Sequence, residues 1–182
     1  MDQSFWKDKK VLITGDTGFK GSWLKCILLN LGSIVYGASL QTDNTYFLNN
    51  ALNKDSKFKE FIFSKKYFHY DLDIREPENI KKKVADISPE IIFHMAAQPL
   101  VIESYKEPSY TWQTNVMGTI NILESIRELN SCSVVVVTTD KVYENNNYKK
   151  SFKETDILGG SDPYSSSKAA VELAVKSWNQ SW

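Results

Sequence analysis

The amino-acid sequence predicts an α/β fold in which helices cover both faces of a doubly wound parallel sheet. Short apolar runs of strand length alternate with helical patterns along the 182 residues, and this alternation is typical of repeated strand-helix-strand units. The runs are apolar at nearly every position, which suits strands that are covered on both faces. With 42% hydrophobic and 13% aromatic residues, a single domain with one core is expected.

The elements follow one another in a regular order. Strands are expected at residues 11–13, 33–37, 67–70, 90–94 and 134–137. Helices are expected at residues 18–31, 76–86, 109–130 and 163–178. The polar stretch 41–57 is expected to be a surface loop with one helical turn at most, and the asparagines at 145–147 predict another loop.

Charge and cysteine content exclude several classes of function. Lys plus Arg number 22 and Asp plus Glu number 22, so no net charge favours nucleic acid or an anionic membrane. Cys26 and Cys132 have no metal-like spacing and are expected to be buried or inert thiols. The start of the sequence leaves no room for a signal peptide, and no apolar run approaches membrane-spanning length, so a cytoplasmic location is expected.

A glycine-rich turn follows the first expected strand. Gly15, Gly18 and Gly21 form a G-x-x-G-x-x-G pattern that leads directly into an apolar helical run. Such glycines permit a tight turn and close approach of a pyrophosphate, and the helix start offers free N–H groups to that anion. Glycines can also serve a sharp turn alone, but their place at the first strand-helix junction favours a Rossmann-type dinucleotide site. No acidic residue or arginine follows at 36–40, so NAD is preferred over NADP only weakly.

A second group of residues suggests proton transfer. Tyr164 and Lys168 are four apart on a helix that Pro163 helps to start, so both lie on one face. An ammonium held near a phenol should lower the phenol pKa, which is ordinarily about 10, and make the tyrosine usable as a base. Thr139, after the fifth strand, could bind the same substrate oxygen.

The glycine turn, the threonine and the Tyr-Lys pair together resemble the extended short-chain dehydrogenase/reductase family, whose catalytic triad is Thr or Ser, Tyr and Lys. The string TGDTGFKGSWL at 14–24 is similar to TGHTGFKGSWL of CDP-glucose 4,6-dehydratases, and the strings at 92–101 and 114–119 are similar too. These enzymes carry Asp-Lys after the triad hydroxyl where dTDP-glucose dehydratases carry Asp-Glu, and this chain has Asp140-Lys141.

The resemblance implies an NAD-dependent nucleotide-sugar dehydratase, a lyase of deoxysugar biosynthesis. Tyr164 would remove the proton of the sugar 4-hydroxyl while a hydride leaves C4 for NAD. Lys168 would tune Tyr164, and Thr139 would orient the 4-oxygen. Asp140 would protonate the departing 6-hydroxyl, Lys141 would handle the C5 proton, and the hydride would return to C6. The implied NAD-binding residues are Gly15, Thr17, Gly18, Phe19, Gly21, Asp73, Ile74, Ala96, Ala97, Gln98, Tyr164 and Lys168.

Other consequences of the resemblance concern assembly and completeness. The two long helices at 109–130 and 163–178 pair in homodimers of this family, and Asn115 has both a structural and a catalytic interpretation. Relatives continue into a C-terminal substrate-binding region, so residues 1–182 are expected to form only the NAD-binding Rossmann domain, inactive or incomplete by itself. The alternatives are a nucleotide-sugar 4-epimerase, a dTDP-glucose-type dehydratase, and a non-catalytic dinucleotide-binding remnant. His94 and His69 are expected to be structural.

Overall fold

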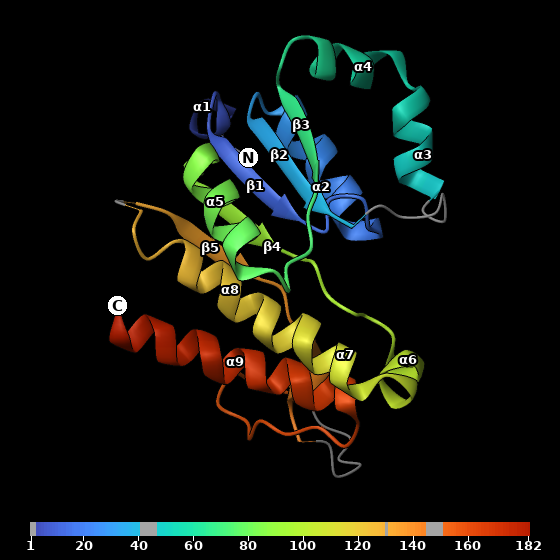
Figure 1. Ribbon diagram of the computed structural model, residues 1–182. Coiled ribbons are helices and arrows are strands. Elements are labelled where there is room, and N and C mark those ends of the chain that lie inside the picture. Colours follow the sequence, from blue (N-terminus) through green and yellow to red (C-terminus); the bar gives the residue numbers. More distant parts are fainter. Residues whose placement is uncertain (1–2, 41–46, 130, 145–150) are drawn as a thin grey trace.

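The computed structural model describes residues 3–40, 47–129, 131–144 and 151–182. Its centre is one parallel sheet with the strand order β3-β2-β1-β4-β5 (Figure 1). The strands are β1 (Lys10–Thr14), β2 (Ile34–Ser39), β3 (Tyr67–Asp71), β4 (Ile91–His94) and β5 (Ser133–Val136). The chain moves outward from β1 to β3 and then returns to build β4 and β5 on the other side. The predicted doubly wound parallel sheet is therefore confirmed.

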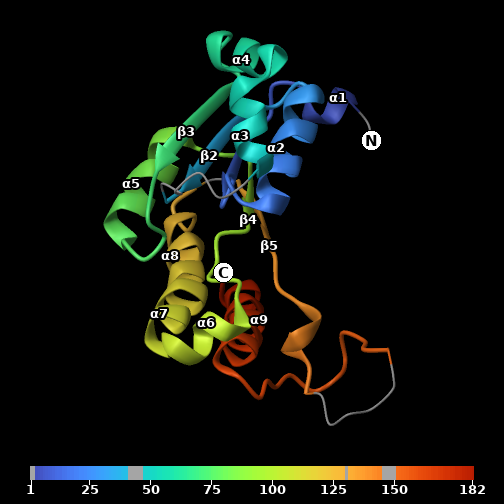
Figure 2. The ribbon, with the colours of Figure 1, turned by 90° about the vertical axis from the view of Figure 1, so that its right-hand side faces the viewer.

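Helices connect the strands and cover the sheet. They are α1 (Gln3–Trp6), α2 (Phe19–Asn30), α3 (Phe47–Lys54), α4 (Ser56–Phe63), α5 (Pro77–Ile87), α6 (Val101–Lys106), α7 (Pro108–Trp112), α8 (Gly118–Ser125) and α9 (Pro163–Ser181), with a π-helical turn η1 (Gln113–Met117) and a 3-10 turn η2 (Asp140–Val142). The helix α2 lies on one face of the sheet, whereas α5 and α8 lie on the other (Figure 1). The segments α7, η1 and α8 follow one another as one long helical rod, and α9 lies beside this rod (Figure 2).

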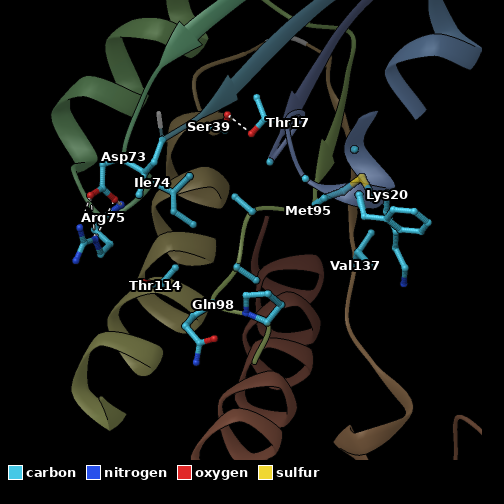
Figure 3. A pocket seen from close by; sticks show the side chains of 18 of the residues that line it. Thr17, Lys20, Ser39, Asp73, Ile74, Arg75, Met95, Gln98, Thr114 and Val137 are labelled. Carbon is cyan, nitrogen blue, oxygen red and sulfur yellow. Dashed lines mark hydrogen bonds and ion pairs between the residues drawn. The ribbon is translucent and has the colours of Figure 1, made fainter. Parts of the chain in front are cut away.

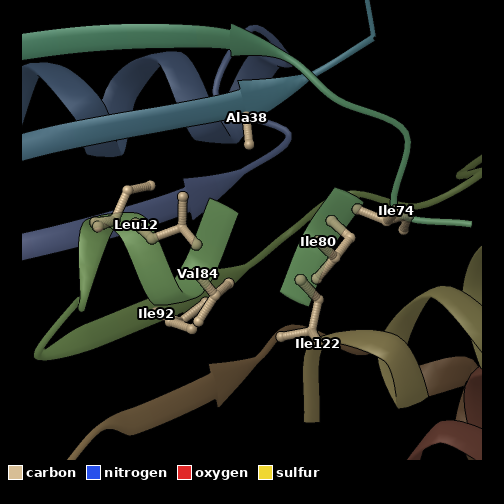
Figure 4. Close-up of a cluster of buried hydrophobic side chains, with 8 residues drawn as sticks. Leu12, Ala38, Ile74, Ile80, Val84, Ile92 and Ile122 are labelled. Atoms are coloured by element: carbon tan, nitrogen blue, oxygen red, sulfur yellow. The ribbon is translucent and has the colours of Figure 1, made fainter. Parts of the chain in front are cut away.

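The two layers of the core come from alternate residues of the same strands. Leu12 of β1 packs against α5 and α8 in a cluster that includes Val84 and Ile122 (Figure 4). Its neighbours Val11 and Ile13 point to the opposite face, where a second cluster forms against α2 and α4. All three β1 residues are buried, because a central parallel strand has helices on both sides. This burial explains the unbroken apolar runs in the sequence.

The expected loop at 41–57 is the largest error in the predicted elements. The structure has α3 and the start of α4 within this stretch, and residues 41–46 lie outside the described part. Asp55 caps α4 by accepting a hydrogen bond of 2.8 Å from the N–H of Phe58. Phe58 is buried, and Leu52 and Phe61 pack against the same cluster. A capping aspartate followed by spaced apolar residues was the signal of α4, and the polar residues around it obscured that signal.

The helix expected at 109–130 is segmented. It begins at Pro108, passes through η1, and ends as α8 at Ser125, followed by turn residues up to 128; residue 130 is not described. The helix α6 was also not predicted, and the loop expected at 145–147 lies outside the described residues. Both cysteines are partly buried, and burial raises the pKa of Cys132 to about 11 and that of Cys26 above its ordinary value. In the described ranges, no helix is both long and apolar enough to span a membrane.

Candidate functional site

A crevice of about 540 Å³ lies at the carboxyl ends of the strands (Figure 3). It lies where the strand order reverses, because the chain adds β2 and β3 on one side of β1 and β4 and β5 on the other. Open parallel sheets bind ligands at this position, because the loops after the two central strands diverge there. The lining includes Gly15, Thr17, Gly18, Phe19, Gly21, Asp73, Ile74, Ala96, Ala97, Gln98, Tyr164 and Lys168. Every residue expected from the sequence to contact the dinucleotide thus faces one continuous space.

The glycine turn forms one wall of the crevice. Gly15 has a φ of 75°, and a Cβ there would lie 2.9 Å from the backbone N of Ala96, so the loops after β1 and β4 could not approach as they do. A Cβ on Gly21 would lie 2.1 Å from the carbonyl oxygen of Gly15. Gly18 is the N-cap of α2 and has no side chain to accept a hydrogen bond. The first N–H groups of α2 therefore remain for an anion.

A chain of hydrogen bonds holds the tips of β1 and β4 together beneath the crevice. The Thr14 hydroxyl accepts the N–H groups of Met95 and Ala96, both at 3.1 Å, and lies 2.7 Å from Nδ1 of His94. His94 Nε2 lies 3.0 Å from the hydroxyl of Thr119, which donates to the carbonyl of Asn115 at 2.6 Å.

His94 itself is structural, as expected. Burial, together with the charge of Lys168, lowers the pKa of His94 to about 3. The ring is therefore neutral at physiological pH. It accepts from Thr14 at Nδ1 and donates to Thr119 from Nε2.

Beside the glycine turn, the crevice is lined by residues at the end of β2 and after β3. Ser39 and Thr17 share a hydrogen bond of 2.9 Å between their hydroxyls (Figure 3). The guanidinium of Arg75 binds the carboxylate of Asp73 and holds its pKa below the usual range. The same guanidinium lies 4.8 Å from the ring centre of Tyr110. The side chain of Asp73 is thus already paired within the protein.

Asn115 joins the crevice loop to the long helix α9. Its Oδ1 accepts the N–H of Gln98 at 2.8 Å, and its Nδ2 donates to the hydroxyl of Ser167 at 2.9 Å. The amide of Gln98 folds back, accepting from the N–H of Leu100 and donating to Thr111. Asn115 lies within η1, and a π-helical turn is a frequent device at functional sites. These contacts give Asn115 a structural role; a catalytic one stays untested.

Tyr164 and Lys168 lie on the first turns of α9, whose N-cap Asp162 accepts the N–H of Ser165 at 2.9 Å. Burial raises the pKa of the Tyr164 phenol, a hydrogen bond with Thr139 opposes that shift, and the charge of Asp140 adds to it. The expectation that Lys168 lowers this pKa is therefore wrong for this structure.

The position of Lys168 gives the reason. Its ammonium donates to the carbonyl of Val137 at 3.2 Å, at the end of β5. Burial lowers its own pKa to about 8, against the opposing charge of Glu172.

The remaining catalytic candidates lie in and around η2. The Thr139 hydroxyl lies 3.1 Å from Oδ1 of Asp140, and both Asp140 and Lys141 are exposed. Asp140 and Lys141 line a second hollow of about 610 Å³, whose lining includes Asp162 and Ser165 on either side of Tyr164 in the sequence. A hydrogen bond to the phenol of Tyr164 places Thr139 at the crevice wall, whereas Asp140 and Lys141 line the neighbouring hollow.

Several lining residues were not predicted. They are Lys20, Ser39, Leu40, Leu72, Arg75, Met95, Pro99, Tyr110, Thr114, Val137 and Thr138. Thr138 donates to the carboxylate of Glu172 at 2.5 Å and so ties β5 to α9. Thr138 and Glu172 are 34 residues apart, so no local spacing in the sequence was a signal for this contact. The hydroxyl of Thr114 is buried and has no hydrogen-bond partner in the described part of the chain.

The amino-acid sequence matches known nucleotide-sugar dehydratases. The profile of the family described as GDP-mannose 4,6 dehydratase matches residues 12–182. The chain is 39% identical to the CDP-glucose 4,6-dehydratase of Salmonella typhimurium over its whole length, which is 48% of that protein. It is 32% identical to the dTDP-D-glucose 4,6-dehydratase of Dictyostelium discoideum, with 96% of this chain and 41% of that protein aligned.

Solved structures share the fold. A UDP-glucose 4-epimerase of Thermus thermophilus in complex with NAD is 26% identical, with a TM-score of 0.78 over 94% of this chain and 51% of that one. The epimerase Mth375 of Methanothermobacter thermautotrophicus is 23% identical, with a TM-score of 0.83 over 100% of this chain and 51% of that one. The chain therefore spans about half the length of the relatives it matches.

Proposed function

Because the chain belongs to the GDP-mannose 4,6 dehydratase family, we propose that it supplies the dinucleotide-binding and catalytic part of an NAD-dependent CDP-glucose 4,6-dehydratase. The observation that carries this proposal is the single crevice that runs from the glycine turn to Tyr164 and Lys168. A dinucleotide in that crevice would have its pyrophosphate at the start of α2 and its nicotinamide near the phenol. The relatives with CDP-glucose and dTDP-glucose dehydratase activity support the reaction class.

The residues of the crevice fit NAD. The N–H groups at the start of α2 suit a pyrophosphate, and the missing side chain of Gly15 lets the loops after β1 and β4 approach each other beside them. At the tip of β2, the hydroxyls of Thr17 and Ser39 could bind the adenosine ribose. Ile74, Ala96 and Ala97 offer apolar walls. The chemistry that NAD supplies is reversible hydride transfer.

The first step would be removal of the proton from the sugar 4-hydroxyl by Tyr164. Thr139 would hold the same oxygen, since its side chain is hydrogen-bonded to the phenol. Lys168, with a pKa of about 8, is mostly protonated at pH 7 and would bind the nicotinamide ribose from its position one turn along α9. The raised pKa of Tyr164 implies that proton removal is more favourable at alkaline pH.

The second step would be loss of water across C5 and C6. Once C4 carries a keto group, the proton on C5 becomes acidic. Lys141 would handle that proton, and Asp140 would supply one to the departing 6-hydroxyl. The hydride taken from C4 would then return to C6, with a proton added at C5. Both side chains are exposed on η2, next to the hydroxyl of Thr139. The Asp140-Lys141 pair favours CDP-glucose over dTDP-glucose as substrate.

The proposed enzyme is a homodimer that pairs through the segments at 109–130 and 163–178. Support comes from large apolar side chains that these segments leave exposed: Trp112, Met117 and Leu173 are 41%, 49% and 57% exposed. Such residues on neighbouring helices suit a helical interface. The proposed location is the cytoplasm, where nucleotide sugars are substrates.

An isotope experiment tests the reaction. The complete natural polypeptide that contains these residues would be incubated with NAD and CDP-glucose that carries deuterium at C4. A dehydratase yields a 4-keto-6-deoxy sugar, detected by its alkaline absorbance, with the deuterium moved to C6.

Other outcomes separate the alternatives. An epimerase, which the solved structures make the second candidate, would leave deuterium at C4 and give no 4-keto product from CDP-glucose, dTDP-glucose or UDP-glucose. A protein that binds NADH but converts none of these sugars would be a binding module, and the dehydratase proposal would be rejected. Asp140→Asn should slow water loss more than C4 oxidation; equal slowing of both would contradict its role.

A further inference from the structure

A buried polar cluster lies directly behind the glycine turn. Its centre is Asp16, which stands between Gly15 and Thr17 in the sequence. Gly15 and Thr17 both line the crevice, whereas Asp16 points away from it and is 0% exposed. The backbone of the turn thus faces the ligand site, and the one acidic side chain of the turn faces the interior.

Three side chains converge on one oxygen of Asp16. The phenol of Tyr67 donates to Oδ2 at 2.6 Å, His69 Nδ1 lies 3.2 Å from it, and the ammonium of Lys25 lies 3.5 Å from it. Tyr67 and His69 come from β3, and Lys25 comes from α2. The Lys25 side chain is also 0% exposed and donates to Asn49 of α3 at 2.9 Å. Asp16 therefore connects the turn to α2 and β3 directly, and to α3 through Lys25.

The charges of this cluster depend on one another. Burial opposes ionisation of Asp16, but the hydrogen bond of His69 and the charge of Lys25 outweigh it and hold the pKa of Asp16 below its ordinary value. Burial lowers the pKa of Lys25, and Asp16 opposes that shift. A buried pair of this kind is tolerated when its geometry is kept, whereas either charge alone is strongly unfavourable. The carboxylate is consequently fixed in place.

The neighbouring strand leaves a space for this carboxylate. Gly37 of β2 has no side chain, and a Cβ there would lie 2.2 Å from Oδ2 and 2.3 Å from Cγ of Asp16. The three nearest atoms to such a Cβ all belong to the Asp16 side chain. Because Tyr67, His69 and Lys25 hold that side chain, it could not swing aside without moving the turn.

The main chain of the turn is held as well. The hydroxyl of Ser22 lies 3.3 Å from the carbonyl of Asp16 and 3.2 Å from that of Thr17, and the N–H of Gly15 donates to Ala38 at 2.7 Å. The peptide groups that face the crevice are thus braced by contacts on the opposite side. Their orientation depends on where the Asp16 side chain is held.

We propose that Asp16 is a positioning residue for dinucleotide binding, which fixes the pyrophosphate-binding turn from behind through Lys25, Tyr67 and His69 without touching the ligand. This inference rests on the proposed binding of a dinucleotide in the crevice. It predicts that an atom added at Gly37, which lies outside the crevice lining, weakens binding only because it displaces Asp16.

The test compares variants of the complete natural polypeptide by NADH fluorescence titration. Gly37→Ala should weaken NADH binding by about tenfold or more, since its methyl group meets the Asp16 carboxylate. Asp16→Ala should also weaken binding, because the turn loses its brace. In the Asp16→Ala background, adding Gly37→Ala should change the Kd by less than about twofold, because the two residues act through one contact.

Two control variants test whether a loss of NADH binding reflects disturbed folding alone. Asp16→Ala leaves Lys25 unpaired, so the same comparison is repeated with Asp16→Ala and Lys25→Met together, which removes both charges. Val35→Ala lies in the same strand as Gly37, is buried, and has no atom near Asp16 among the contacts described. It should lower the melting temperature and leave the NADH Kd within about twofold of the unaltered protein.

The outcomes are distinct. If the unaltered protein does not bind NADH, both the proposed function and this inference fail. If it binds NADH and Gly37→Ala binds equally well, the positioning role alone is rejected. The role is also rejected if the Gly37→Ala loss persists in full without the Asp16 side chain, or if Val35→Ala weakens binding as much as Gly37→Ala does. The role is supported if Gly37→Ala weakens NADH binding when Asp16 is present and has no further effect on the Kd when Asp16 is replaced by Ala.

Discussion

The two ends of the crevice are built in different ways. At the glycine turn, β1 and β2 are central strands, and the buried Asp16 is held by side chains of α2 and β3. At the tyrosine end, β5 is an edge strand of the described sheet, and Ser133 and Val135 are exposed. Lys168 is held there by one carbonyl, and Asp140 and Lys141 are exposed. The dinucleotide end is therefore rigidly braced, whereas the catalytic end depends on fewer contacts.

The largest expected effect is a loss of activity from a substitution at the tyrosine end, with NADH binding at the glycine turn unchanged. We expect Tyr164→Phe to lower kcat of the complete enzyme by about 1,000-fold, because it removes the proposed acid-base group. The NADH Kd and the melting temperature should change little, since the phenol is only part of the crevice wall. Steady-state kinetics with CDP-glucose measure the first effect. A tenfold loss or less would contradict the assigned role.

Substitutions behind the glycine turn should have their strongest effect on the free energy of unfolding. Lys25→Met leaves the Asp16 carboxylate buried without its ammonium partner, and we expect the free energy of unfolding to fall by about 3 kcal/mol. Lys66→Met is the matched control, because it breaks an ion pair with Asp8 in which both side chains are exposed, and it should lower the free energy of unfolding far less than Lys25→Met does. Urea unfolding measures both. Equal losses would show that burial of the pair is unimportant.

One substitution made in two strands compares the ends directly. Val35 in β2 is 0% exposed, whereas Val135 in β5 is 46% exposed. Val→Ala should lower the free energy of unfolding by about 2 kcal/mol at position 35 and by under about 1 kcal/mol at position 135. The same urea experiment measures the difference. A larger loss at Val135 would reverse the comparison.

The smallest expected effect is a pH dependence of the free energy of unfolding. It comes from His94 at the end of β4, between the glycine turn and the tyrosine end. His94 has a pKa of about 3 in the folded chain against an ordinary value of 6.5. The unfolded chain therefore binds a proton at this residue between these values, and the folded chain does not. The stability from neutral His94 is complete above pH 6.5 and is lost as the pH falls, by about 1 kcal/mol per pH unit.

The variant His94→Gln isolates this contribution. Gln keeps one acceptor and one donor for Thr14 and Thr119 but does not titrate. Urea unfolding at pH 6.5 and pH 5 should show a smaller decline for the variant than for the unaltered protein. Parallel declines would mean that His94 is protonated in the folded chain.

The sequence predicted what depends on local pattern. The five strands, the start of α2 and the face shared by Tyr164 and Lys168 follow from periodicity and from Gly and Pro positions. The pKa of Tyr164 could not be predicted, because it depends on burial and on Asp140, whose position relative to the phenol is set by the tertiary fold. Asp16 was missed for the same reason, since its partners lie on α2 and β3.

The π-helical turn has a consequence for insertions and deletions in this chain. Such a turn contains one residue more than a regular helical turn. Removing Val116 would let the helix continue regularly at small energetic expense, but it would rotate Asn115 by about 100° relative to α8. Its amide would then no longer reach Gln98 and Ser167 together. A shortened helix could thus remain well folded while the loop and α9 separate.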